Sequence, residues 1–243
     1  MLTGLEIYSL WDKVFSLPSG LLVYFFLEWY LHATAAHGIG INEKGKYPFP
    51  WKMYLLRVLS VGYAFSHYFK GKSEGERRKQ FIEKCNLWNW TISLILMMCS
   101  FGVISADLVL LIPFLQGING YRFISRSLEI IWAFGFDIVH KPPYKSNLNR
   151  YERLRLALMS YFEIYIYSAS FYVTIIHYTD DNMMVFKSIM MSLSVGTLTN
   201  IAYSQNDANL SHWLQLFPFV QVMATLSLVV LGLAIYVSQS PES

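Results

Sequence analysis

Three long apolar segments in the second half of the chain are typical of membrane-spanning helices. The first, Leu87–Ser105, opens with Trp88 and Trp90, which suit the interface between membrane and water. The other two are Leu154–Ile176 and Trp213–Val237. Each has about the 20 residues that a helix needs to cross a bilayer. The pattern therefore predicts three membrane-spanning helices in these positions.

A fourth span is predicted between the first two of these segments. Asp107 marks a short hairpin, and Leu108–Val139 then reads as one apolar helix with a bend expected at Pro113. Arg122 and Arg126 lie on one face of this helix. Two arginines near a basic loop are too few for a steep voltage sensor, so we expect them to anchor the helix at the inner interface.

The region between the last two spans is shorter and more polar. Val185–Leu198 is an amphipathic segment, and Thr199–Leu210 is a polar one. Irregular backbone at membrane depth is tolerated only where protein buries it or where it lines a cavity. We therefore expect a short re-entrant helix and a loop that are enclosed by several copies of the chain.

Residues 1–86 mix apolar patches with charges and histidines. Pro18–Ile41 is long enough to cross a membrane, but Glu28 and His32 near its centre argue against contact with lipid. We favour a helix of a cytoplasmic domain; if the segment did cross, the N-terminus would change sides. Trp51–Phe69 is also predicted to be helical. The expected division is thus a regulatory domain (1–86), two spans with a basic loop (87–153) and a module from 154 to 243.

Composition and charge support a membrane protein and give it an orientation. Hydrophobic residues make up 54% of the chain and charged residues 14%, against about 25% charged residues in soluble domains. Lysines and arginines cluster before the first span and between the second and third spans, whereas the remaining connections are mainly acidic. Because positive loops stay in the cytoplasm, we expect both termini to be cytoplasmic. The predicted fold class is an all-α, multi-pass protein of the inner membrane.

Three groups of residues resemble a known family. They are Arg126, Glu129 and Ile130 in the second span; Tyr151, Arg153, Tyr161, Glu163 and Ile164 in the third; and Ser192, Thr197 and Thr199 around the short helix. Over residues 121–237 this order resembles the two-span pore-loop ion channels of bacteria, which are related to potassium channels. The resemblance implies a homotetramer around a central pore. Small channels of this kind, controlled by a cytoplasmic ligand, also resemble effectors of antiviral defence that depolarise the membrane.

The segment that follows the short helix departs from the family. The family's filter reads T-x-G-Y-G-D, whereas residues 197–204 read TLTNIAYS and contain no glycine. Filter glycines allow successive carbonyl groups to face the ion. We therefore expect a pore without ordinary potassium selectivity, lined by polar side chains of this segment. The candidate residues are Thr197, Thr199, Asn200, Tyr203 and Ser204. A non-conducting membrane scaffold with a degenerate pore module is the alternative.

Two further features each have two interpretations. Glu163 lies in the middle of an otherwise uncharged span, so it is either a structural hydrogen-bond partner of the short helix or an acid that faces the pore. The basic segments either contact anionic membrane lipids or bind a nucleotide or single-stranded nucleic acid on the cytoplasmic side. Their candidate residues are Arg77, Arg78, Lys79, Lys141, Lys145, Arg150 and Arg153.

Enzymatic motifs are not found in the sequence. The six histidines have no short metal-binding spacing, and the chain has neither a glycine-rich phosphate loop nor a nucleophile elbow. Cys85 and Cys99 lie in unlike surroundings, which does not favour a disulfide framework. We expect a protein that is not an enzyme and that binds neither metal nor cofactor.

Overall fold

The computed structural model describes residues 4–40, 60–139, 147–176, 184–199 and 216–229, and this part of the chain is helical without strands. Its elements are α1 (Gly4–His37), α3 (Val61–Gly71), α4 (Gly75–Ser105), the short 3-10 helix η2 (Val109–Leu111), α5 (Ile112–Val139), α6 (Arg150–Ile176), α7 (Met184–Gly196) and α9 (Leu216–Leu226). The prediction of an all-helical protein is confirmed for these residues.

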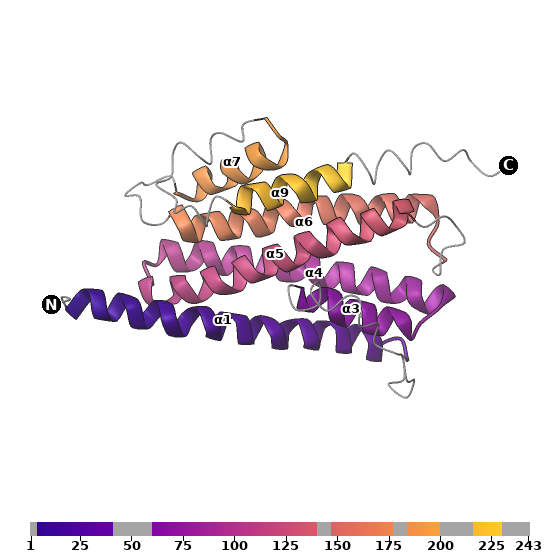
Figure 1. The fold of residues 1–243 in the computed structure, drawn as a ribbon, viewed down its shortest axis with the longest axis horizontal. Coiled ribbons are helices and arrows are strands. Elements are labelled where there is room, and N and C mark those ends of the chain that lie inside the picture. The colour runs from indigo at the N-terminus through magenta and orange to yellow at the C-terminus, as the bar shows by residue number, and fades with distance from the viewer. Residues whose placement is uncertain (1–3, 41–59, 140–146, 177–183, 200–215, 230–243) are drawn as a thin grey trace.

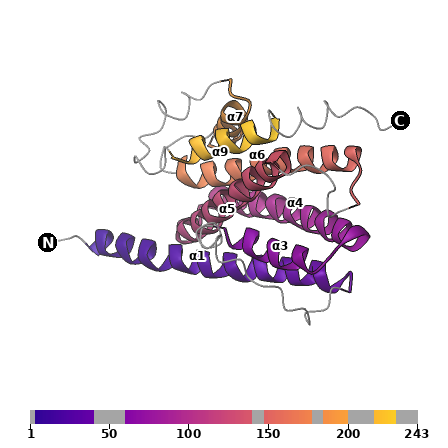
Figure 2. The same ribbon diagram turned by 45° about the vertical axis from the view of Figure 1, so that its right-hand side comes forward.

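The helices form a layered bundle. Figures 1 and 2 show α1 and α3 on one side, α4, α5 and α6 in the middle, and α7 and α9 on the opposite side. The main core joins buried apolar side chains of α1, α4, α5, α6 and α9, with Phe81, Phe123 and Tyr167 among those that are fully enclosed. The first helices therefore share one core with the later ones.

The predicted division at residue 86 falls inside α4. α4 begins at Gly75, twelve residues before the predicted span, and the charged residues between Glu76 and Lys84 lie in its first turns. α1 also packs along α5 rather than apart from it, and Glu28 of α1 pairs with Arg122 of α5. The N-terminal segment is thus packed into the bundle, because its buried groups find their partners on the later helices.

The sequence predicted a bend at Pro113. In the structure, Pro113 stands in the first turn of α5. Proline is well tolerated there, because the first turn lacks intrahelical partners for its N–H groups. Asp107, the predicted hairpin residue, has a φ of 51° in the connection between α4 and η2. The connection from α4 to α5 is therefore short and consists of this turn and η2.

One of the described helices, Gly75–Ser105, is long and apolar enough by composition to cross a membrane, and Val185–Gly196 and Leu216–Val229 are shorter apolar helices. The predicted third span corresponds to α6. The predicted last span corresponds in part to α9, and its residues beyond Val229 lie outside the described residues. Four spans and a re-entrant helix thus remain a prediction.

Candidate functional site: a buried charge network beside a short helix

Arg122 is a fully buried arginine in the middle of α5. Its guanidinium forms an ion pair with Glu28 of α1. It also donates to the side-chain oxygen of Asn89 on α4, at 2.5 Å, and to the hydroxyl of Tyr167 on α6, at 2.9 Å. One side chain therefore connects four helices.

Arg126 lies one turn further along α5 and is buried as well. Its Nε and one terminal nitrogen donate to the two carboxylate oxygens of Glu163, at 2.9 and 3.0 Å. The other terminal nitrogen donates to Glu129 at 2.8 Å, and Asn86 of α4 accepts a further bond at 3.1 Å. Such a two-pronged pair is the strongest geometry that an arginine and a carboxylate can adopt.

The structure locates Glu163 inside this network. The carboxylate is fully buried on α6, and its partner is Arg126 of α5, whereas the sequence suggested the short helix or the pore. The expected role of Arg122 and Arg126 as interfacial anchors is wrong for the same reason: both lie in the core. Their spacing on an apolar helix was visible in the sequence, but their partners come from three other helices.

The second feature of the candidate site is the position of α7, which packs between α6 and α9. Ser192 of α7 donates to the carbonyl of Tyr165 at 2.8 Å and lies 2.6 Å from the hydroxyl of Ser168, both on α6. Gln221 of α9 donates to the carbonyl of Ser192 at 2.9 Å and accepts from Tyr172 of α6 at 2.7 Å. These buried hydrogen bonds fix the position of α7 against both neighbours.

α7 ends in a close contact with α6. A Cβ added at Gly196 would overlap the ring of Tyr165 and would lie 3.0 Å from the side-chain nitrogen of Gln221. The chain continues into exposed residues, and the hydroxyl of Thr197 bonds to the Leu193 carbonyl at 2.7 Å and lies 3.0 Å from that of Thr199. The remaining predicted filter residues, Asn200, Tyr203 and Ser204, lie outside the described residues.

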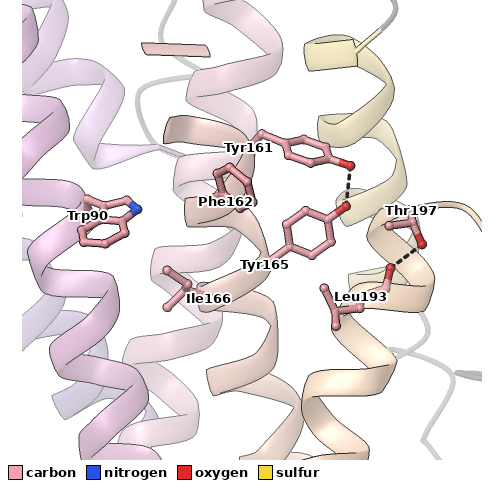
Figure 3. A pocket seen from close by; sticks show the side chains of 7 residues that line it. All are labelled: Trp90, Tyr161, Phe162, Tyr165, Ile166, Leu193 and Thr197. Carbon is pink, nitrogen blue, oxygen red and sulfur yellow. Dashed lines mark hydrogen bonds between the residues drawn. The ribbon is translucent and has the colours of Figure 1, made fainter. Parts of the chain in front are cut away.

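A cavity of about 340 Å³ adjoins the end of α7. Figure 3 shows the side chains around it, which come from α4, α6, α7 and the residue that follows α7: Trp90, Tyr161, Phe162, Tyr165, Ile166, Leu193 and Thr197. The hydroxyl of Tyr165 donates to that of Tyr161 at 2.5 Å. The cavity is therefore an aromatic and aliphatic space next to the last turn of the short helix.

The two basic segments meet at one end of the bundle. Lys79 of α4 donates to Glu152 of α6 at 2.6 Å. Arg78 donates to the carbonyl of Lys70, Arg153 donates to that of Leu148, and Arg77 is exposed. Lys141, Lys145 and the side chain of Arg150 lie outside the described residues. This contact brings the two basic segments to the same end of the bundle.

Glu152 also caps α6. Its backbone N–H donates to the Asn149 side chain, and its carboxylate accepts from the Asn149 N–H, both at 2.8 Å. This reciprocal pair is a capping box, in which glutamine can replace glutamate. The hydrogen bond from Lys79 and the bond from Asn149 lower the pKa of Glu152.

A pH-dependent contribution of this pair to stability follows. Because the pKa of Glu152 is lower in the folded chain, its stabilising effect is complete above the ordinary glutamate pKa and is lost as the pH falls through the lowered value. Glu152→Gln keeps the capping box and removes the ion pair. We expect the melting temperature of the wild type to exceed that of E152Q slightly at pH 7 and to match it well below pH 4. A constant difference across this range would contradict the assignment.

Among the described residues, no group of three or more histidine, cysteine or acidic side chains could hold a metal ion. Comparison of the chain with protein-family models, curated proteins and solved structures finds no match.

Proposed function

We propose that the chain is a subunit of a tetrameric pore-loop ion channel in the cell inner membrane. The observation that supports it most directly is the position of α7, a 13-residue helix that is held between α6 and α9 by buried hydrogen bonds and is followed by Thr197 and Thr199. A pore loop needs this order, in which a short helix supported by two spans presents polar groups at its end.

The outward faces of α7 and α9 support an assembly of several copies. Phe186, Met190 and Leu193 form an exposed stripe on α7, and Phe219 and Met223 are exposed on α9. A single copy cannot enclose a conduction path. Four copies around one axis would cover part of these stripes, and lipid would cover the rest.

Ion selectivity in this proposal comes from side chains, since residues 197–204 contain no glycine. Thr199→Val removes one hydroxyl and keeps the shape of the side chain. In planar bilayers we expect this variant to conduct with a shifted reversal potential under mixed sodium and potassium. The matched control is Thr91→Val on α4, whose hydroxyl bonds only its own helix, to the Leu87 carbonyl, and which should leave the reversal potential unchanged.

The same recordings test the function itself. Native mass measurement in detergent should give a tetramer, and purified protein should conduct, with control by an anionic ligand applied at the basic end. A short oligothymidylate and ATP are the probes, and ligand-triggered depolarisation would fit a role in antiviral defence. A tetramer that carries no current with either probe would favour the non-conducting scaffold. A monomer would contradict the channel proposal, because a single copy cannot enclose a pore.

A further inference from the structure

We propose that α1 crosses the membrane, with the hydrocarbon of the bilayer covering its outward face and its N-terminal end on the side opposite to the basic segments. This inference rests on the proposal that the chain is a membrane protein. It replaces the expectation that residues 1–86 form a cytoplasmic domain and that both termini are cytoplasmic.

The polarity of α1 is inverted relative to a helix in a soluble domain. Between Gly20 and Ala36, its acidic and histidine side chains, Glu28 and His32, are buried against the bundle. Its outward face carries large apolar and aromatic side chains that are 40–63% exposed: Leu21, Leu22, Val23, Phe25, Phe26, Trp29 and Tyr30. Water would contact all seven, whereas lipid would cover them without exposing the buried carboxylate.

α1 occupies the same depth of the bundle as the candidate span in α4. At one end, Lys84 of α4 donates to the carbonyl of Gly38, just beyond α1, at 3.0 Å. At the other end, Gly20 lies against residues 114–118 in the first turns of α5, beyond the turn that ends α4. Residues 20–38 therefore extend over the same length of the bundle as α4 does from Lys84 to its C-terminal end, about 28 Å at 1.5 Å per residue. If α4 lies in the hydrocarbon layer, α1 lies in it too.

The contact at Gly20 is of a kind that membrane helices use. A Cβ built on Gly20 would lie 3.1 Å from the backbone nitrogen of Ile118 and the carbonyl oxygen of Phe114, and 3.2 Å from the Cα of Gly117. Two backbones approach this closely only where small residues face each other, and such residues are enriched between helices in membranes. Close backbone packing of this kind thus contributes to the contact between α1 and α5.

The distribution of charged residues indicates which end of α1 faces the cytoplasm. The C-terminal end of α1 lies beside Lys84, at the end of the bundle that carries Arg77, Arg78 and Lys79. Residues 1–17 carry Lys13 against Glu6 and Asp12. Since the side that is richer in lysine and arginine stays in the cytoplasm, and residues 1–17 carry a single lysine, the N-terminal end belongs outside.

The test is the accessibility of single cysteines in the full chain, in a background with Cys85→Ala and Cys99→Ser. A membrane-impermeant maleimide is added to spheroplasts of a bacterial host. We expect Thr3→Cys to be labelled in intact spheroplasts and Arg77→Cys only after permeabilisation. Any other combination overturns the inference, including labelling of both positions only after permeabilisation. Release of the protein by alkaline carbonate would instead refute the membrane proposal itself, so the two failures are distinguishable.

A second measurement identifies what covers the outward face. A nitroxide at Phe26→Cys in reconstituted vesicles should collide with oxygen, which is enriched in hydrocarbon, and hardly at all with a water-soluble nickel chelate. A nitroxide at Ala35→Cys, which faces the bundle, is the matched control and should be shielded from both. Accessibility of the Phe26 position to nickel, or its protection from both reagents by a second copy, would overturn the assignment to lipid.

Discussion

Arg122→Met should lower the free energy of unfolding by about 3–5 kcal/mol, the cost of removing one partner from a buried ion pair. The side chain is fully buried, and the substitution leaves the carboxylate of Glu28 enclosed without its guanidinium. It also removes the donors that Asn89 and Tyr167 meet in the wild type. Unfolding in mixed micelles with increasing denaturing detergent measures the loss.

The control for this substitution is Arg77→Met, which changes an exposed arginine on α4. Surface changes usually stay within about 0.5 kcal/mol. The double variant Glu28→Gln with R122M completes a double-mutant cycle, and it should lose clearly less stability than the two single variants added together. Additive losses, or an R122M variant as stable as R77M, would mean that the pair does not hold α1 to α5.

Gly196→Ala should destabilise the seat of α7 by about 1–3 kcal/mol, as overpacking of a well-filled site does. The new methyl group would overlap the Tyr165 ring, which is itself held by a hydrogen bond to Tyr161. Because the residue precedes Thr197 directly, we also expect the proposed tetramer and its proposed conductance to be lost. Native mass measurement and bilayer recording report these two effects separately.

Gly102→Ala provides the matched control on α4. A Cβ at that position meets nothing within 4 Å, so the change should be neutral or stabilise the helix by up to about 1 kcal/mol. In the double variant G196A with Tyr165→Leu, the side chain opposite residue 196 is shorter. This double variant should therefore recover part of the stability that G196A loses. If G196A were as stable and as oligomeric as G102A, the close contact between α6 and α7 would not be needed.

The buried network and the lipid-facing surface follow one rule. In water a helix buries its apolar stripe and exposes its charges, whereas in a bilayer the costly groups are the charges, and they turn inward and pair. Arg122, Arg126 and Glu163 are buried in the bundle, while Phe26 and Trp29 face outward. This arrangement is the common support for the pore proposal and for the crossing of α1.

Hydrophobic pattern alone determined where most helices lie. The apolar stretches predicted α4, α5, α6 and α7 within a few residues at most ends, because each is a local run of apolar side chains bounded by polar or helix-breaking residues. The charge clusters correctly predicted that the two basic segments share one end of the bundle, since Lys79 reaches Glu152. Both signals are contained in neighbouring positions of the chain.

Only the tertiary structure decided what the polar residues do. Glu28 and His32 argued from sequence against a helix in lipid, because a sequence does not reveal that the carboxylate meets Arg122, 94 positions away. Glu163 has its partner on α5 rather than on α7, and Gly196 acquires its role only from the Tyr165 ring beside it. The preference of a residue for water, lipid or protein is local, whereas the partner that makes its burial favourable is set by packing between distant segments.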